Sequence, residues 1–129
     1  MPKWTAAEFQ RLIEREDDDV ELKSGASPRK LQEAMVAFTN SGGGTIFIGV
    51  NDQRVVIGRR RDQGTDDAIH EAALNGVNIG RYAISGGTVD GTSIVVVDVE
   101  PREDEVAQTS DGRVLRRRGG RNVAVFGAE

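Results

Sequence analysis

The sequence has no cysteine, a single histidine and few aromatic side chains. Without cysteine, the chain can build neither a disulfide scaffold nor a thiolate metal site. One histidine, His70, excludes a metal site made of several histidines from one chain, and its place in an expected helix is typical of a surface residue. Aromatic residues make up only 5% of the sequence, so recognition of nucleic-acid bases by stacking has little support.

Long apolar runs are missing as well. No segment approaches the roughly 20 residues that span a bilayer, and no basic-then-apolar leader opens the chain. We therefore expect a cytoplasmic protein that does not contact membranes. With 129 residues, of which 37% are hydrophobic and 29% charged, the chain can bury one modest core. We expect one domain over residues 1–129.

The net charge of −4 argues, on average, against a nucleic-acid ligand. The charges are nevertheless segregated along the chain, with an acidic segment at 14–21 and arginine clusters at 59–61 and 113–121. Arginine clusters favour phosphate contact, because binding releases counterions. Salt bridges from these arginines to the acidic segment inside the fold are the alternative. The candidate phosphate-contacting residues are Arg59, Arg60, Arg61, Arg113, Arg116, Arg117, Arg118 and Arg121.

Capping residues and apolar periodicity predict helices over about 5–14, 28–39 and 65–75. Alternating or continuous apolar runs predict strands over 20–23, 45–50, 55–58, 81–84, 93–100 and 113–117. A turn at 51–53 is expected to join two of these strands into a hairpin, and the apolar tail at 122–129 has no clear element. This order mixes helices with antiparallel hairpins. It predicts an α+β domain with two to three helices and a mixed, mainly antiparallel sheet.

A group of charged residues surrounds the first expected strand. Glu21 and Lys23 are two positions apart, so their side chains share one face of that strand. Glu16 can approach them from the end of the first helix, and Asp52 follows the central strand. Glu16, Glu21 and Asp52 are candidate ligands for Mg²⁺ or Mn²⁺ and, with Lys23, candidate catalytic residues for phosphodiester cleavage. A solvated acidic turn is the simpler alternative.

A glycine-rich segment, Asn-Ser-Gly-Gly-Gly at 40–44, joins the second expected helix to the central strand. Its backbone amides could form an anion-binding nest, which makes Asn40, Gly42, Gly43 and Gly44 candidates for binding a nucleotide phosphate. A phosphate loop normally leads into a helix N-terminus, whereas this segment follows a helix. We therefore interpret it mainly as a tight structural turn.

Three motifs together resemble the Schlafen AlbA-like domain family. They are Val20-Glu-Leu-Lys, a helix ending in Ala37-Phe-Thr-Asn-Ser-Gly-Gly-Gly, and the strand Thr45-Ile-Phe-Ile-Gly-Val-Asn-Asp. Gly58 and the run Arg116-Arg-Arg-Gly-Gly also match the family pattern. The resemblance covers a core of about residues 10–122, and its most specific part is 34–52.

The resemblance implies a nucleic-acid-binding domain that in some members cleaves transfer or ribosomal RNA. The site of those members resembles E-x4-E-F-K with an aspartate after the central strand. Glu16, Glu21 and Lys23 fall on that pattern, whereas Asn51 takes the aspartate position. Asp52 comes next, but a continuing strand would point it the other way. An uncharged Asn51 lowers the expectation of catalysis.

Three functions follow as hypotheses. The first is binding of RNA or DNA by backbone and shape recognition through the arginine clusters, which could serve regulation. The second is cleavage of structured RNA such as transfer RNA with Mg²⁺ or Mn²⁺. A homodimer is expected for it, since two such lobes enclose the RNA in Schlafen proteins. The third is an ATP-binding or nucleotide-binding module of a transcriptional regulator, a label common in the family.

Overall fold

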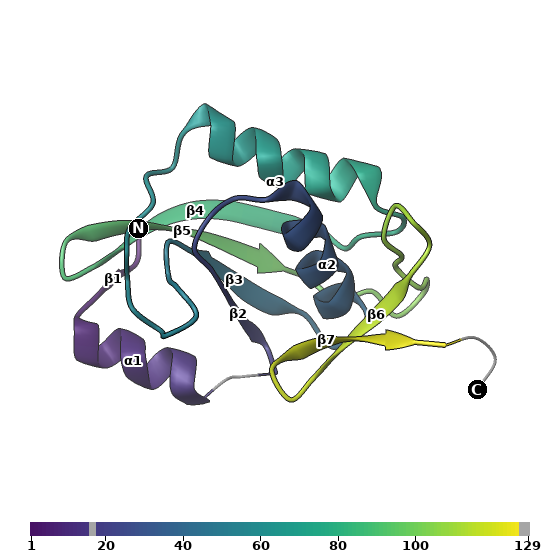
Figure 1. Cartoon of the computed structure of the whole chain (residues 1–129), viewed down its shortest axis with the longest axis horizontal. Coiled ribbons are helices and arrows are strands. Elements are labelled where there is room, and N and C mark those ends of the chain that lie inside the picture. The colour runs from purple at the N-terminus through teal and green to yellow at the C-terminus, as the bar shows by residue number, and fades with distance from the viewer. Residues whose placement is uncertain (16–17, 127–129) are drawn as a thin grey trace.

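A computed structural model describes residues 1–15 and 18–126 (Figure 1). Its helices are α1 (Ala6–Arg15), α2 (Pro28–Thr39) and α3 (Gln63–Asn75). Its strands are β1 (Lys3–Trp4), β2 (Val20–Lys23), β3 (Gly44–Ile48), β4 (Tyr82–Val89), β5 (Thr92–Val99), β6 (Val114–Arg118) and β7 (Arg121–Val125). Within the described residues, no helix is long and apolar enough to cross a membrane.

The main sheet has five strands in the order β1-β4-β5-β3-β2. Strand β5 is antiparallel to both of its neighbours, β3 and β4. At the two edges of the sheet, β2 pairs in parallel with β3 and β1 pairs in parallel with β4. Strands β6 and β7 form a separate antiparallel hairpin, which packs mainly on α2. The predicted α+β class with a mixed sheet is confirmed.

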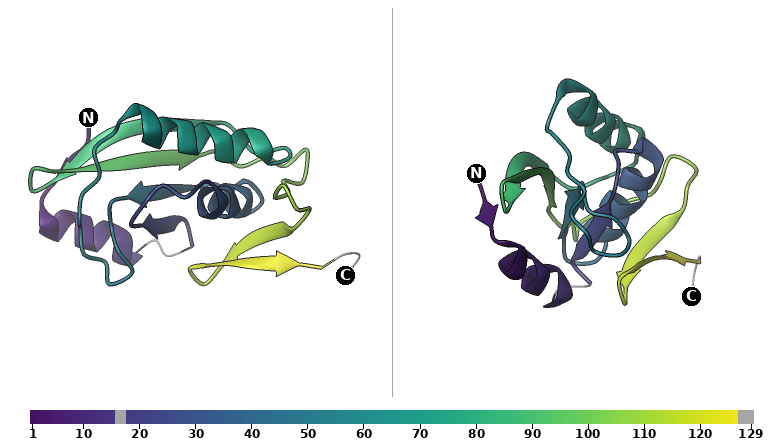
Figure 2. Two further views of the ribbon diagram at one scale, coloured as in Figure 1. Left: turned by 45° about the horizontal axis from the view of Figure 1, so that its top comes forward. Right: turned by 60° about the vertical axis from the view of Figure 1, so that its left-hand side comes forward.

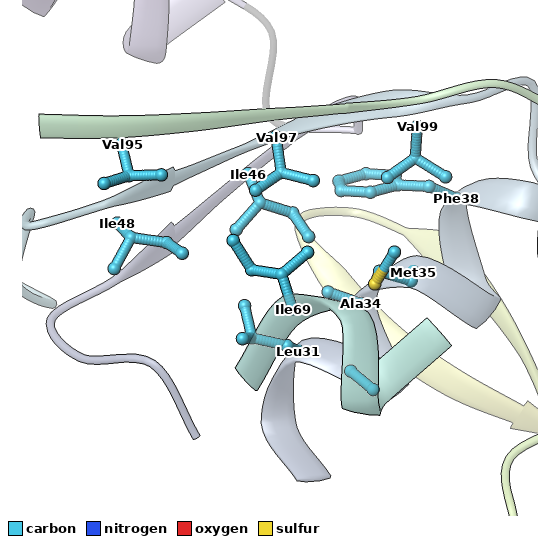
Figure 3. Close-up of a cluster of buried hydrophobic side chains, with 11 residues drawn as sticks. Leu31, Ala34, Met35, Phe38, Ile46, Ile48, Ile69, Val95, Val97 and Val99 are labelled. Carbon is cyan, nitrogen blue, oxygen red and sulfur yellow. The ribbon is translucent and has the colours of Figure 1, made fainter. Parts of the chain in front are cut away.

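The main sheet is buried on both faces, because helices cover it from opposite sides (Figure 2). Figure 3 shows one face, where α2 and α3 place Phe38 and Ile69 against Ile46 of β3. The next residue of β3, Phe47, points the other way and meets Phe9 of α1 with the ring centroids 5.1 Å apart. Side chains of a strand alternate between its faces, so a continuous apolar run serves both cores.

Local capping explains where two helices begin. The predicted capping box of α1 is confirmed, since the Thr5 amide donates to Glu8 Oε1 at 2.8 Å and the Glu8 amide donates to Thr5 Oγ1 at 3.1 Å. Helix α3 begins two residues earlier than expected. The Asp62 carboxylate accepts a hydrogen bond from the Thr65 amide at 2.8 Å, so Asp62 is its N-cap.

The prediction of a return strand over 55–58 is wrong. Only an isolated bridge joins Val50 to Val56 there. The Asn51 side-chain oxygen instead accepts hydrogen bonds from the amides of Gln53 and Val55, each at 3.0 Å. This local side-chain bonding competes with strand pairing and folds residues 51–55 into a turn.

Three strands differ from expectation because pairing with another strand, rather than the local apolar pattern alone, sets their extent. Strand β4 is longer than the predicted 81–84, since it pairs with β5 along its whole length. Strand β7 and the two-residue strand β1 were not predicted. β7 pairs with β6, and β1 pairs with the far end of β4.

Candidate nucleic-acid interface

A cleft of about 340 Å³ lies between the edge strand β2 and the turn of the β6–β7 hairpin. Its charged lining includes Glu21, Lys23, Asp52, Arg117 and Arg121. Three of the four candidate catalytic residues therefore surround one space, and the fourth, Glu16, lies outside the described residues. Asp52 reaches the cleft because β3 ends at Ile48 and the chain turns before residue 52.

Both carboxylate oxygens of Glu21 are already paired with cations. Lys23 Nζ lies 2.7 Å from Glu21 Oε2, and an Arg117 nitrogen lies 2.7 Å from Glu21 Oε1. These two positive charges disfavour a metal cation at Glu21. Among residues 1–15 and 18–126, no group of three or more histidine and acidic side chains could hold a metal ion. The described side chains by themselves therefore do not form a site for Mg²⁺ or Mn²⁺, and Glu16, the third candidate ligand, lies outside the described residues.

Arg117 is buried, although it stands in the middle of an arginine run. Its side chain is 3% exposed. It donates to the carbonyl oxygen of Val20 at 2.6 Å and to the side-chain oxygen of Asn122 at 2.9 Å. Its guanidinium lies 5.2 Å from the centre of the Phe38 ring, within cation–π range. For Arg117, the alternative of a salt bridge to the acidic segment is realised through Glu21.

The exposed arginines of the hairpin share its outer face. Arg116 and Arg118 are exposed, while Leu115 and Arg117 point inward. Arg118 is directly opposite Arg121, which is also exposed. We call Arg116, Arg118 and Arg121 the outer arginine face. Residues 114–125 include neither aspartate nor glutamate, although Asp18 approaches the turn and accepts from the Gly119 amide at 2.8 Å.

The remaining candidate arginines are elsewhere, and most are bonded within the fold. Arg113 lies 2.8 Å from Glu33 and 3.0 Å from Asp111, and the hydrogen bond to Glu33 is the main reason why the pKa of Arg113 is raised. The segment 59–61 leads into α3, on the opposite side of the molecule from the β6–β7 turn (Figures 1 and 2).

Within that segment, Arg61 and Asp66 form an ion pair at 3.1 Å, and Arg59 donates to the Thr65 hydroxyl at 2.9 Å. Arg60 is exposed. Two of the three arginines thus secure the entry to α3, and the segment lies at a distance from the outer arginine face.

Asn40, a candidate phosphate-loop residue, is bonded to two other segments of the chain. Its side-chain nitrogen donates to the carbonyl oxygens of Ala107 at 3.0 Å and Leu115 at 2.9 Å, and its oxygen accepts from the Ala107 amide at 2.9 Å. The neighbouring Ser41 hydroxyl accepts from the Arg117 amide at 2.8 Å. The polar side chains of this turn hold β6 in place, a role that sequence reasoning missed.

The glycines of the same turn serve the end of α2. The Gly43 amide donates to the Phe38 carbonyl at 2.8 Å. A Cβ atom on Gly44 would lie 2.4 Å from the Phe38 ring, so this glycine allows a close approach of helix and strand. Gly42 has a φ of 88° and no neighbour that a Cβ would meet. This geometry is that of a structural turn and gives the nucleotide hypothesis no added support.

His70 lies on the surface of α3, as its sequence context indicates. Its Nδ1 atom is 2.6 Å from the Tyr82 hydroxyl. Burial raises the pKa of that tyrosine. His70 belongs to α3 and Tyr82 to β4, and neither residue lines the cleft.

Comparison with known proteins identifies a family and solved structures with a related fold. The sequence profile of the family described as Schlafen, AlbA_2 matches residues 16–125. No curated protein matches the chain. The crystal structure of the DIP2311 protein from Corynebacterium diphtheriae shares the fold with a TM-score of 0.70 at 18% sequence identity. The match covers 86% of this chain but only 22% of DIP2311, so this chain corresponds to a small part of that protein. Because the profile spans most of its length, the chain belongs to the Schlafen AlbA_2 family.

Proposed function

We propose that this domain binds nucleic acid through phosphate contacts made by the outer arginine face. One observation carries the proposal. Arg116, Arg118 and Arg121 are all exposed on one side of a hairpin that contains no acidic residue. Arginine pairs with phosphate through a planar fork of donors. Membership of the AlbA_2 family supports a role connected with nucleic acid.

The geometry of the hairpin suits a charged polymer. Arg116 and Arg118 are two positions apart on one strand, a separation of about 6.6 Å along the strand. Arg121 lies across from Arg118. A two-stranded ribbon also has the shape to enter a groove of duplex nucleic acid. The scarcity of aromatic side chains favours contact with the backbone over base stacking.

The adjoining cleft extends the positive surface. Lys23 and Arg121 line it together with Asp52, and the charge of Glu21 is offset by the two cations beside it. A phosphate bound to the hairpin turn would therefore meet further positive charge at the end of β2. This arrangement favours a nucleic-acid backbone that runs along the hairpin and across the cleft.

The proposal is tested by measuring affinity over a range of salt concentrations. Fluorescence anisotropy with labelled transfer RNA, single-stranded DNA and duplex DNA gives the slope of log Kobs against log salt. Replacing Arg116, Arg118 and Arg121 by alanine should make that slope shallower by about 0.7–0.9 for each phosphate that is no longer neutralised. A matched triple variant replaces the exposed Arg11, Arg29 and Arg81 by alanine.

Two results would contradict the proposal. One is no binding by the wild-type protein to any of the three nucleic acids at low salt. The other is an equal loss of affinity in the hairpin variant and in its matched control. The second result would show that only total charge matters.

A second candidate function, RNA cleavage, is favoured by one observation. Glu21, Lys23 and Asp52 line the same cleft next to the outer arginine face. In this proposal Lys23 stabilises charge that develops on a phosphate. The contribution of Glu16 and the pairing of two copies into a homodimer remain predictions, which a Glu16→Gln variant and analytical ultracentrifugation check.

Cleavage is tested by incubating transfer RNA with the protein in Mg²⁺, Mn²⁺ or EDTA. Fragments that disappear in Glu21→Gln and Lys23→Met, and persist in Asp90→Asn on the β4–β5 turn, would support an active site in the cleft. RNA that stays intact with the wild-type protein under every condition would leave binding as the function. Fragments that persist in Glu21→Gln would indicate a contaminating nuclease.

A further inference from the structure

The side chain of Arg117 points into the protein, whereas those of its neighbours Arg116 and Arg118 are exposed. We infer that Arg117 is a positioning residue, which holds the outer arginine face in place and makes no phosphate contact itself. The inference rests on the proposed function, because it concerns how the same surface is presented. It assigns separate roles to adjacent arginines that have the same charge.

The Arg117 side chain joins three strands. It reaches from β6 to the carbonyl oxygen of Val20 on β2 at 2.6 Å, and it pairs with Glu21 of the same strand at 2.7 Å. It also donates to Asn122 on β7 at 2.9 Å. With 3% of its side chain exposed, its charge is directed into the protein. The guanidinium therefore fastens both strands of the hairpin to the edge of the main sheet.

The backbone of β6 is held at two further points. The Asn40 side chain donates to the Leu115 carbonyl at 2.9 Å, and the Ser41 hydroxyl accepts from the Arg117 amide at 2.8 Å. These bonds hold β6 beside the end of α2, and the Leu115 side chain is buried against Val36 and Ala37 of α2. Because side chains alternate along a strand, residues 116 and 118 must then point outward. The inward contacts decide which arginines reach the ligand.

Replacing Glu21 tests this inference through the direction in which the affinity for nucleic acid changes. Removing an acidic charge close to a site for a polyanion normally raises affinity, because repulsion falls. If Glu21 acts by holding Arg117, then Glu21→Gln should lower affinity instead. Asp19→Asn is the matched control, since Asp19 is an exposed acidic residue directly before β2 and its replacement removes the same charge. We expect affinity in Asp19→Asn to stay at the wild-type level or to rise.

The first test compares Arg117→Gln with Arg118→Gln by anisotropy on transfer RNA over a series of salt concentrations. Arg118→Gln should make the slope shallower by about 0.7–0.9, which corresponds to one phosphate. Arg117→Gln should lower affinity about tenfold with the slope unchanged, because the outer arginine face still neutralises the same phosphates in the complex but binding must first order a loosened hairpin. A shallower slope in Arg117→Gln, or higher affinity in Glu21→Gln, would overturn the inference.

The second test needs no ligand. Hydrogen exchange of the β6–β7 amides should accelerate about tenfold or more in Arg117→Gln and Glu21→Gln, while the β5 amides keep their wild-type rates. Equal protection of the hairpin in all proteins would overturn the inference. Faster exchange of β5 would show a global loss of stability and would overturn it as well. If wild type binds no nucleic acid, the proposed function fails together with this role, and exchange alone then reports whether Arg117 fastens the hairpin.

Discussion

A 2.7 Å ion pair joins Glu21 on β2 to Arg117 on β6, and it connects the edge of the main sheet to the separate hairpin. Replacing Glu21 would leave the largely buried Arg117 charge without its carboxylate partner, whereas Glu21 would keep Lys23 as a partner if Arg117 were replaced. The pair also explains why the arginine run divides in two. One arginine neutralises an acidic residue inside the fold, and its neighbours on the same strand are left facing solvent.

We expect Asn40 to be sensitive to the chemistry of its side-chain amide. Asn40→Ala should destabilise the domain by about 1–3 kcal/mol, because it removes three hydrogen bonds to Ala107 and Leu115. Asn40→Asp should be worse, since a carboxylate oxygen would face two carbonyl oxygens. Urea unfolding measures both variants. Asn75→Asp, at an exposed position of α3, is the control, and an Asn40→Asp variant as stable as that control would contradict this assignment.

Two glycines of the same turn should respond differently to alanine. Gly44→Ala would place a Cβ atom 2.4 Å from the Phe38 ring, so we expect a loss of about 1–3 kcal/mol or more from overpacking. Gly42→Ala meets no neighbour, so its only cost comes from the φ of 88°, about 1 kcal/mol. Thermal unfolding of the two variants side by side checks the order. The reverse order would show that backbone conformation, rather than close packing, selects glycine here.

Acid should weaken the fold through carboxyl groups whose pKa is lowered in the folded state, among them Glu8, Asp62, Asp104 and Asp111. The amide of Thr5 lowers the pKa of Glu8, the amide of Thr65 lowers that of Asp62, and the Thr109 hydroxyl lowers that of Asp111. A group whose pKa is lower in the folded state stabilises it above the unfolded pKa, and this contribution is lost as pH falls through the folded value. The unfolded values are near 4.5 for glutamate and 3.8 for aspartate.

Urea midpoints measured from pH 7 down to pH 3 should therefore drop most steeply below about pH 4.5. A variant with Glu8→Gln, Asp62→Asn and Asp111→Asn should show a shallower drop over the same range. Parallel curves for this variant and the wild-type protein would show that other groups govern acid sensitivity.

The arginine cluster at 59–61 gives a prediction about where the nucleic-acid-binding surface lies. Arg60→Ala should leave the salt slope of nucleic-acid binding unchanged, because the segment 59–61 lies away from the hairpin (Figure 1). Arg118→Ala should make the same slope shallower by about 0.7–0.9. If Arg60→Ala has the larger effect, the binding surface includes the entry to α3 and the proposed interface must be redrawn.

Much of the fold was predictable because its signals are local. The capping box at Thr5 and Glu8, Pro28 at the start of α2 and the apolar run of β3 each specify an element within a few residues. Spacing alone also grouped Glu21 with Lys23, which form an ion pair at 2.7 Å. The motifs at 20–23 and 37–52 were sufficient to indicate the family, which the profile match confirms.

Several features that were not predicted depend on partners distant in sequence. Strand β1 is only two residues long and exists by pairing Lys3 and Trp4 with Thr88 and Val89 at the far end of β4. The role of Asn40 depends on Ala107 and Leu115, which lie 67 and 75 positions away. No local signal identifies such a partner, so the sequence indicated a tight turn at 40–44 but not what the Asn40 side chain holds together.

The arginine run shows most clearly what the sequence determined and what the tertiary structure determined. The sequence by itself established that Arg116 and Arg118 must share one face of a strand and Arg117 the other, because side chains alternate along a strand. It could not choose which face points inward. Tertiary structure made that choice, since Glu21 and the carbonyl of Val20 on β2, together with Ser41 after α2, all bond to Arg117. Burial of a charge requires such partners, and only the folded chain brings them to one place.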